Sequence, residues 1–385
     1  MLADRTLCTG CSSCASICPN NCIQMVPNSQ GFLYPYINKE ICVNCGLCEK
    51  SCPIITPSIL HSASSCTAFA AYITETAIRQ ESSSGGLFTL IASHVINLGG
   101  VVFGACFDNN QKVIHTYSET LTGLQKFRGS KYVQSDIGNS FSTVKKFLTE
   151  GRIVLFSGTP CQVGGLHKFL GKEYPNLISL DFVCHGIPAP AIWQKYLAEL
   201  SQKFKSPVKA VSFRDKRFGW KSYCVRLDFE NGKTYLAPPA LDPYMRSFLS
   251  DLTLRSSCFH CKFKGSKRIS DFTLADFWGI EHVYPTFDDN QGTSLILIHN
   301  EKASLFLSKL THNVKISEVD SDIALKLNPS ALKSATTPVA YSRFADDIQN
   351  SSFFQTVEKH CKIPLILKFK LKLHFIIKCF CNSAK

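Results

Sequence analysis

Eight cysteines near the beginning of the chain have the spacing of metal ligands. They form two identical C-x-x-C-x-x-C-x-x-x-C-P runs, which are Cys8, Cys11, Cys14 and Cys18 before Pro19, and Cys42, Cys45, Cys48 and Cys52 before Pro53. Three thiolates two residues apart can wrap one iron-sulfur cube only if their loop folds around it, so the fourth ligand must come from elsewhere. Structural zinc sites also use C-x-x-C pairs, but two such runs exceed what tetrahedral zinc needs. The spacing therefore predicts two 4Fe-4S clusters.

The two runs resemble those of the bacterial two-cluster ferredoxins. In that family the fourth cysteine of each run ligates the other cluster. The resemblance therefore assigns Cys8, Cys11, Cys14 and Cys52 to one cluster, and Cys42, Cys45, Cys48 and Cys18 to the other. Cys22 is left over, and we expect it to be a small buried residue. Because so short a unit cannot build a sufficient apolar core, cluster binding must supply much of its folding energy.

Four more cysteines lie further along the chain. Cys161 and Cys184 each follow an apolar, strand-like run, and Cys258 and Cys261 form a C-x-x-C pair among basic residues, which favour thiolates. The carboxyl ends of parallel strands meet at one sheet edge, where doubly wound folds bind ligands. The four cysteines predict a third 4Fe-4S cluster; the alternatives are a zinc site, a redox disulfide, or plain packing of the first two. The cysteines expected to be only structural are Cys66, Cys106, Cys224, Cys361, Cys379 and Cys381.

Two polar segments have the residue types that hold a phosphate-bearing cofactor. Residues 82–88 (Ser-Ser-Ser-Gly-Gly-Leu-Phe) open a predicted helix, where exposed backbone N–H groups and the helix dipole favour an anion. A tight turn is the alternative for the Gly-Gly pair. Residues 128–135 (Arg-Gly-Ser-Lys-Tyr-Val-Gln-Ser) add a cation, a hydroxyl and an aromatic plane, although a lone lysine is more often a solvated charge.

Together with segments 157–162, 181–186 and 274–279 and the C-x-x-C pair, these segments resemble the beta subunit of coenzyme F420 hydrogenase/dehydrogenase, an iron-sulfur flavoprotein family. The likeness covers about residues 66 to 300 and implies FAD. The residues expected to bind it are Ser84, Gly85, Gly86, Ser130, Lys131, Tyr132, Gln134, Thr159, Pro160, Gln162 and Asp276. Asp276 would hold a cofactor hydroxyl or cap the next turn. His185 is the candidate catalytic proton source, and an ordinary sheet-edge histidine is the alternative.

The pattern of apolar residues around these segments predicts an α/β fold. Strands are expected at 68–73, 101–107, 152–156 and 177–183, helices at 86–98, 139–148 and 189–204, and an antiparallel hairpin at 221–236. Strands that alternate with helices imply a mainly parallel sheet with an antiparallel insertion, preceded by an α+β ferredoxin-like unit. The predicted domains are a two-cluster ferredoxin domain (1–57), a linker (58–65), a flavin-binding domain (66–340) and a basic hydrophobic tail (341–385).

That tail combines lysines with Leu, Ile and Phe, and no acidic residue follows Glu358. Residues 367–375 alternate apolar and basic side chains with a period of two, which indicates a strand, although an amphipathic helix is also compatible. A terminal element packed on the core is preferred over attachment to a membrane surface, which would need a continuous apolar face. No run is long and apolar enough to span a bilayer.

Composition narrows the class of protein further. Apolar residues make up 45% and charged residues 18%, as in globular chains. The formal charge of +13 falls when clusters are counted, since each oxidised 4Fe-4S core with four thiolates is net about −2. The remaining excess favours an anionic substrate, an acidic partner or a membrane surface over nucleic acid. Without a leader before Cys8, nineteen cysteines that are concentrated in C-x-x-C groups indicate a reducing cytoplasm.

These features predict an iron-sulfur flavoprotein oxidoreductase. A ferredoxin or a redox partner subunit would exchange electrons with the N-terminal clusters, and a third cluster would connect them to FAD. FAD would exchange a hydride with a small anionic acceptor such as a deazaflavin. The alternatives are a non-catalytic electron-transfer subunit that carries only the clusters, and a sensor or scaffold that the clusters stabilise.

Overall fold

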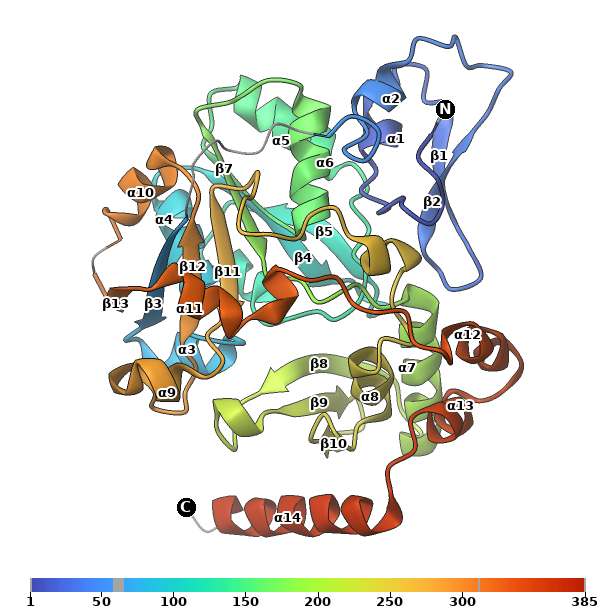
Figure 1. Cartoon of the computed structure of the whole chain (residues 1–385), viewed down its shortest axis with the longest axis vertical. Coiled ribbons are helices and arrows are strands. Elements are labelled where there is room, and N and C mark those ends of the chain that lie inside the picture. Colours follow the sequence, from blue (N-terminus) through green and yellow to red (C-terminus); the bar gives the residue numbers. More distant parts are fainter. Residues whose placement is uncertain (1, 58–65, 311, 384–385) are drawn as a thin grey trace.

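The computed structural model describes residues 2–57, 66–310 and 312–383, so the linker predicted at 58–65 lies outside the described residues. An eight-stranded sheet forms its centre, with the strand order β13-β3-β12-β11-β7-β6-β4-β5 (Figure 1). Its strands are β3 (Thr67–Ile73), β4 (Val101–Phe107), β5 (Val113–Ser118), β6 (Val154–Ser157), β7 (Leu177–Phe182), β11 (Phe272–Asp276), β12 (Ser294–Ile298) and β13 (Val314–Val319). Neighbours β4, β6, β7 and β11 are parallel, whereas β5, β12 and β13 pair antiparallel.

Helices cover both faces of this sheet because successive strand residues point to opposite sides. Val102 of β4 and Leu155 of β6 pack under α4 (Leu87–Asn97) and α10 (Glu301–Leu307). Their chain neighbours Val101 and Val154 pack on the other face, under α5 (Ser140–Thr149) and α6 (Pro160–Leu170). The shorter helices are α3 (Thr76–Glu81), α9 (Ile280–Val283) and α11 (Ser321–Lys326). The predicted mixed fold with a mainly parallel sheet is therefore confirmed.

A second, three-stranded antiparallel sheet lies beside the first (Figure 1). It consists of β8 (Val208–Asp215), β9 (Cys224–Phe229) and β10 (Thr234–Ala237), the last two forming the hairpin that the sequence predicts. It shares one apolar core with α7 (Pro190–Phe204), α8 (Pro243–Leu249), α12 (Tyr341–Asn350) and α13 (Phe353–His360). Phe344 and Phe353 are fully buried there, so residues 341–360 belong to the packed body rather than to a separate tail.

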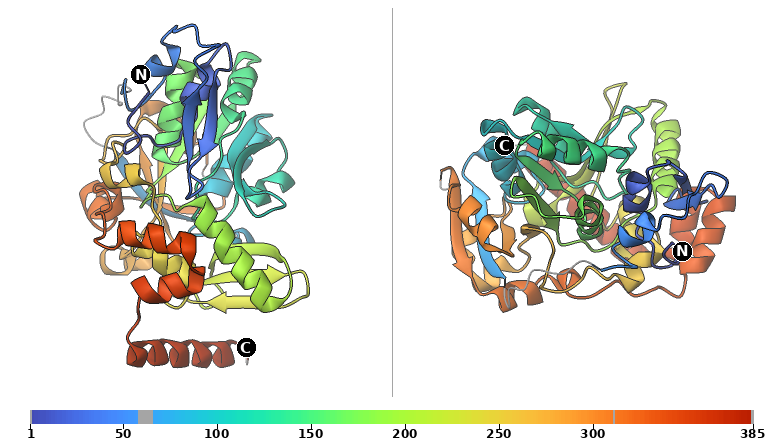
Figure 2. Two further views of the ribbon diagram at one scale, coloured as in Figure 1. Left: turned by 90° about the vertical axis from the view of Figure 1, so that its right-hand side faces the viewer. Right: turned by 90° about the horizontal axis from the view of Figure 1, so that it is seen from above.

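The ferredoxin-like unit contains α1 (Ser13–Ile17), α2 (Leu47–Lys50) and the antiparallel pair β1 (Ile23–Pro27) and β2 (Leu33–Ile37). It lies against α6 and α7 of the body (Figure 2). Cys11 approaches α6 so closely that a Cβ added to Gly165 would come within 2.9 Å of the cysteine sulfur. Near the start of α7, the Ala191 N–H donates a hydrogen bond to the Gln30 carbonyl oxygen at 3.0 Å.

Residues 365–383 form a helix, α14 (Leu365–Ser383), so the strand indicated by the alternation is wrong and the helical alternative holds. A lone strand would leave its backbone N–H and C=O groups unpaired, whereas a helix satisfies them internally. Leucine and lysine also have high helix propensity. No helix among the described residues is both long and apolar enough to cross a bilayer.

The contact at Gly31 provides a test of how the ferredoxin-like unit is held. Gly31 has a φ of +81°, and an added Cβ would lie 2.7 Å from the Ala191 nitrogen, whereas Gly232 has a φ of +80° with open space around it. Both alanine substitutions strain the backbone, but only Gly31→Ala also crowds the unit against α7. We expect Gly31→Ala to cost about 1–3 kcal/mol more than Gly232→Ala.

Thermal unfolding of the cluster-loaded protein, with limited proteolysis to detect release of residues 2–57, measures this difference. Equal shifts in the unfolding midpoint for the two variants would show that the close approach at Gly31 contributes nothing.

Candidate metal centres and cofactor site

The first cysteine run curls around a pocket near the body of the protein. Its walls include Cys8, Cys11, Cys14 and Cys52, the four cysteines that the ferredoxin resemblance assigns to one cluster. Three of them come from the loop before and within α1, and Cys52 arrives from beyond α2. Cys52 lies at least 38 residues from the other three cysteines in the sequence. The structure thus brings together cysteines of both runs, as a crossed ligand set requires.

Both cysteine runs contain two residues with positive φ angles, and these residues bend each loop around its pocket. In the first run Gly10 and Ser12 have φ values of +68° and +64°, and in the second Asn44 and Gly46 have +53° and +71°. These residues occupy the same two positions of the C-x-x-C-x-x-C repeat. The left-handed conformation is costly for residues other than glycine, so its recurrence indicates that each loop is shaped around the same kind of object.

The second pocket contains five cysteines rather than four. Its walls include the four cysteines that the ferredoxin resemblance assigns to the second cluster (Cys42, Cys45, Cys48 and Cys18), but Cys22 lines it too. The Cys22 sulfur lies 3.2 Å from the Cys18 sulfur and also interacts with the Cys42 thiol. Cys22 is buried, as expected from the sequence, but its position in this pocket is not what we expected of a residue that only packs. The sequence signal that could have placed Cys22 in this pocket is its spacing of four residues from Cys18.

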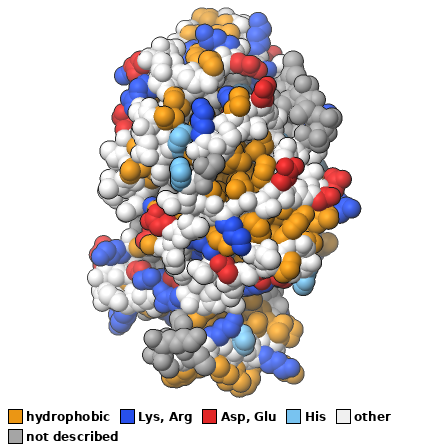
Figure 3. All heavy atoms as spheres, turned by 90° about the vertical axis from the view of Figure 1, so that its left-hand side faces the viewer, with side chains coloured by type: hydrophobic (Ala, Val, Ile, Leu, Met, Phe, Trp, Pro, Cys, Tyr) orange, Lys and Arg blue, Asp and Glu red, His pale blue; other side chains and the backbone are white. Residues whose placement is uncertain are grey.

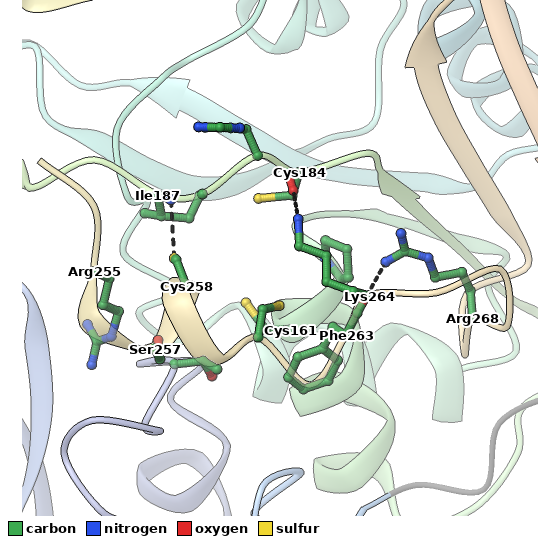
Figure 4. Close-up of a pocket in the computed structure, with 14 residues that line it drawn as sticks. Cys161, Cys184, Ile187, Arg255, Ser257, Cys258, Phe263, Lys264 and Arg268 are labelled. Carbon is green, nitrogen blue, oxygen red and sulfur yellow. Dashed lines mark hydrogen bonds between the residues drawn. The ribbon is translucent and has the colours of Figure 1, made fainter. Parts of the chain in front are cut away.

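The third pocket gathers the remaining candidate ligands from three distant segments (Figure 4). Cys161 lies in the first turn of α6, its sulfur 3.1 Å from the Thr159 hydroxyl, and Cys184 follows β7. Because β6 and β7 are parallel neighbours, both cysteines lie at the same edge of the sheet. Cys258 and Cys261 come from the short 3-10 helix at Ser256–His260 and the residue after it.

Local capping explains how α6 presents Cys161. Pro160 occupies the first helical position, where its missing N–H costs nothing. The Thr159 hydroxyl accepts a hydrogen bond from the Gln162 N–H, and the Gln162 side chain accepts one from the Thr159 N–H. This reciprocal pair fixes the start of the helix directly beside the third pocket.

Buried cations line the third pocket, whereas none of the described residues lining it is a carboxylate. Arg255 is 1% exposed and Arg268 is 3% exposed. The Lys264 ammonium donates hydrogen bonds to the carbonyl oxygens of Cys184 and Ser330. Figure 4 shows Lys264 and Arg268 on one side of the cysteines and Arg255 on the other. Four thiolates around a 4Fe-4S core are net about −2, so this environment fits an anionic cluster.

Burial makes these thiols weak acids unless a metal replaces the proton. Desolvation raises the pKa of Cys258 to about 11 and that of Cys184 to about 12, with neighbouring thiols adding to the effect. In the first pocket burial likewise raises the pKa of Cys11 to about 11. At neutral pH such groups would hold their protons, so any metal that binds to them must displace those protons.

The three pockets lie in series. Leu2 lines both the second and the first pocket, and Thr9 lines both the first and the third. Arg255 reinforces the junction between the last two: its guanidinium donates to the carbonyl oxygens of Cys8 at 2.7 Å and Leu33 at 2.9 Å. It also donates to Gln134, whose amide donates to the Thr9 carbonyl oxygen at 3.0 Å. Sequence reasoning missed this role of Arg255.

No three His, Cys, Asp or Glu side chains within residues 2–57, 66–310 and 312–383 are spaced to hold a single metal ion. A cube distributes its ligands over four irons, one thiolate to each, so this finding concerns mononuclear sites only.

The residues predicted to bind FAD separate into two groups. Gln134, Thr159, Pro160 and Gln162 cap α6 or secure the ferredoxin-like unit. The segments around Ser84, Ser130 and Asp276 instead converge elsewhere at the same sheet edge. Ser130 is hydrogen-bonded to the Ser83 hydroxyl through both its N–H, at 2.7 Å, and its own hydroxyl, at 2.9 Å.

Two cations that the sequence did not single out connect these segments. The Arg214 guanidinium binds the Asp276 carboxylate at 2.8 Å and lies 3.4 Å from the Tyr132 hydroxyl. The Lys216 ammonium donates to the Ser84 carbonyl oxygen at 2.9 Å, and burial lowers its pKa to about 7. Arg214 lies in β8 of the second sheet and Lys216 directly follows that strand. The motifs recognised in the sequence belong to the first sheet, so they could not have indicated these two residues.

The glycine pair at the start of α4 has a packing role. A Cβ on Gly85 would lie 2.5 Å from the Ala71 carbonyl oxygen, so β3 itself requires glycine there. The Gly85 N–H donates to the Ser294 hydroxyl at 3.0 Å, and the Ser84 hydroxyl donates to the Thr293 carbonyl oxygen at 2.9 Å. Gly86 has a φ of +86°, and an added Cβ would lie 2.6 Å from the Ile73 side chain, so the turn interpretation accounts for both glycines without a phosphate.

His185 lines the third pocket next to Cys184. Its Nε2 pairs with the Asp251 carboxylate, and its Nδ1 lies 3.3 Å from the Ser330 hydroxyl. Its ring meets Phe248 edge-on at 5.5 Å, and Phe248 in turn lies 5.2 Å from the Tyr132 ring. One aromatic side chain thus separates the third pocket from the convergence of Tyr132, Arg214 and Asp276.

Pockets lined by paired cysteine runs define an iron-sulfur electron-transfer protein, and sequence comparisons agree. Residues 7–54 match the family model of the 4Fe-4S dicluster domain. Residues 151–322 match that of the C terminus of the coenzyme F420 hydrogenase/dehydrogenase beta subunit. The resemblance to both families is therefore confirmed for these two regions.

Two individual proteins are similar over parts of the chain. An uncharacterized polyferredoxin-like protein of Methanocaldococcus jannaschii is 38% identical over 58 residues, which are 13% of this chain and 34% of the relative. The chain thus spans about a third of the length of that curated relative. A chain of the F420-reducing nickel-iron hydrogenase complex of Methanosarcina barkeri aligns with a TM-score of 0.49 and 14% identity, over 74% of this chain and 94% of that one.

The five-cysteine pocket leads to a prediction about cluster ligation. We expect Cys18→Ala to keep its iron, because Cys22 lies close enough to take over the ligand position. Cys22→Ala should also keep it, and only the double variant should lose about four irons per chain. Iron and acid-labile sulfide, quantified after anaerobic purification, decide the matter. Loss of four irons from Cys18→Ala alone would show that Cys22 cannot replace Cys18.

Proposed function

We propose that the protein is an oxidoreductase that transfers electrons between an external one-electron carrier and a bound flavin. The series of three thiol-lined pockets carries this proposal, because clusters in adjoining pockets form a path for single electrons. A ferredoxin or partner subunit exchanges electrons at the second pocket, whose Cys45 is exposed. FAD, when bound, couples these single electrons to the transfer of a hydride to or from a small anionic acceptor.

The proposed ligands of the third cluster are Cys161, Cys184, Cys258 and Cys261. Their support is the mutual proximity of their thiols, the absence of carboxylates among the described residues of the pocket wall, and the cations around it. FAD is proposed to lie at the neighbouring convergence of Ser130, Lys131, Tyr132 and Asp276. His185 is proposed as the proton carrier between the two because it touches the pocket and, through Phe248, approaches Tyr132.

Iron content tests the third cluster. We expect about twelve irons per chain in anaerobically purified protein and about eight in Cys184→Ala. Cys106→Ala is the matched control: Cys106 is a buried cysteine that lies in β4, away from the pocket, so this variant should keep about twelve. Eight irons in the unsubstituted protein, or zinc in place of iron, would remove the third cluster from the proposal.

Lys131 provides a test of flavin binding. Desolvation lowers the pKa of its ammonium to about 7, and the ammonium donates to the carbonyl oxygens of Lys126 and Arg128. Below that pH the group is cationic and attracts a phosphate; above it the charge is lost. We therefore expect FAD to dissociate more readily as the pH rises from 6 to 8, on the order of tenfold per unit once Lys131 is mostly neutral.

An arginine at this position stays charged throughout this range. Lys131→Arg should therefore flatten the pH dependence, whereas Lys131→Gln should lower FAD content at every pH. Lys126→Gln removes a nearby exposed charge and serves as the control. Fluorescence of released FAD against pH, with iron content measured in parallel, gives the readout. An identical pH profile for the original protein and Lys131→Arg would exclude Lys131 from the site.

A second candidate function is an electron-transfer subunit that carries only clusters. The observation that favours it is the internal bonding of Ser84, Gly85 and Lys131, whose polar groups are already satisfied by the protein. Full iron content without flavin, even after incubation with FAD, would support this function over the enzyme.

A further inference from the structure

We propose that α14 docks the protein on an anionic membrane surface, lying flat in the lipid headgroup region with its apolar face in the bilayer. The proposal concerns a part of the chain separate from the three pockets, so it stands or falls independently of the proposed redox function.

One side of α14 is fixed to the body. Phe375 meets the ring of Phe218 edge-on at 5.8 Å, and the Lys378 ammonium donates to the Ser222 hydroxyl at 2.7 Å. Near the beginning of the helix, Lys368 pairs with Glu358 at 3.2 Å. Residues 368, 375 and 378 lie on one face at 100° per residue, so the helix has a defined orientation.

The opposite side of α14 is apolar and has no partner among the described residues. The side chains that form it are between 48% and 83% exposed, and they are Leu365, Phe369, Leu373, Ile376, Ile377 and Phe380. They span about a third of the helix circumference. This is the continuous apolar face that attachment to a membrane surface requires, and which the sequence pattern alone did not establish.

Charge identifies lipid as the occupant of this face. Lys370 and Lys372 are exposed and lie at the two borders of the apolar arc. The closest acidic residue in sequence, Glu358, is already paired with Lys368 and Arg246, and none follows it. An apolar stripe between two lysines matches an anionic leaflet, where headgroups meet the cations and acyl chains meet the stripe.

The position of α14 allows such docking. In two views at right angles it lies beyond the rest of the described chain at one end of the molecule, past the three-stranded sheet (Figures 1 and 2). The space-filling view shows apolar side chains on its outward side, with lysines beside them (Figure 3). A flat surface can therefore contact the apolar face without meeting another element first.

A second copy of the chain fits this face less well. A helix of 19 residues is about 28 Å long and about 10 Å wide, a footprint of about 280 Å². Stable dimers bury about 800 Å² per partner. Two facing lysine borders would also repel each other.

Flotation of the full chain with lipid vesicles tests the proposal. We expect binding to vesicles of phosphatidylcholine mixed with phosphatidylglycerol, weak binding to phosphatidylcholine alone, and release at high salt. Phe369→Ser, Ile376→Ser and Phe380→Ser combined should abolish binding. Leu98→Ser, Leu121→Ser and Leu305→Ser combined replace three similarly exposed apolar side chains elsewhere and should leave it unchanged. Iron content verifies that each variant is folded.

A second variant tests the charges without altering the apolar face. Each lysine near an anionic surface contributes about fivefold in affinity, so Lys370→Gln combined with Lys372→Gln should weaken binding about 25-fold. Binding to neither vesicle type, or equal binding to both, would overturn the proposal. So would a dimer, measured by light scattering, that the Phe369, Ile376 and Phe380 substitutions convert to a monomer, because it would assign the face to a second copy.

Discussion

A buried thiol loses its proton only where positive charge replaces the water it has left, and the architecture of this protein follows from that constraint. Burial raises the pKa of Cys11 and Cys258 to about 11 and that of Cys184 to about 12, so each of these groups keeps its proton at neutral pH unless a metal binds to it. The loops that carry them hold residues such as Ser12 and Asn44 in the left-handed conformation. Binding of iron to thiolates offsets both the ionisation and the strain, which makes metal binding and folding of the ferredoxin-like unit one process.

Arg255 connects the first and third cysteine pockets, because it lines the third pocket and binds the Cys8 carbonyl oxygen. It is buried without a carboxylate partner among the described residues of its surroundings, and it binds the Cys8 and Leu33 carbonyl oxygens on one side and Gln134 on the other. The net negative charge of an iron-sulfur cluster in the first pocket stabilises a buried cation of this kind. The same residue thus joins the ferredoxin-like unit to the body and places a positive charge beside the first pocket. An exposed lysine could do neither, because it has no fixed fork of donors.

The two ends of the molecule perform different physical tasks. Around the pockets, cations point inward toward buried thiols, whereas on α14 lysines border an outward apolar face. The formal charge of +13 therefore does not describe one basic surface. Part of that charge lies on buried cations beside the third pocket, and part lies on the lysines of α14.

The sequence alone determined the features that depend on local spacing. Cysteine spacing predicted two clusters. Apolar periodicity predicted the bounds of β4, and those of α4, α5 and α7 to within one residue, because backbone geometry sets the repeats of strands and helices. The three pockets in series, the fifth cysteine beside Cys18, and the meeting of Tyr132 with Asp276 through Arg214 depend on residues far apart in the chain. Likewise, the sequence of residues 367–375 alternates apolar and basic residues as a strand would, although these residues form part of α14. Only the contacts of α14 with Phe218 and Ser222 decided which face of this helix is exposed to solvent. Tertiary packing settles such matters because it brings together surfaces whose sequence separation carries no periodic signal.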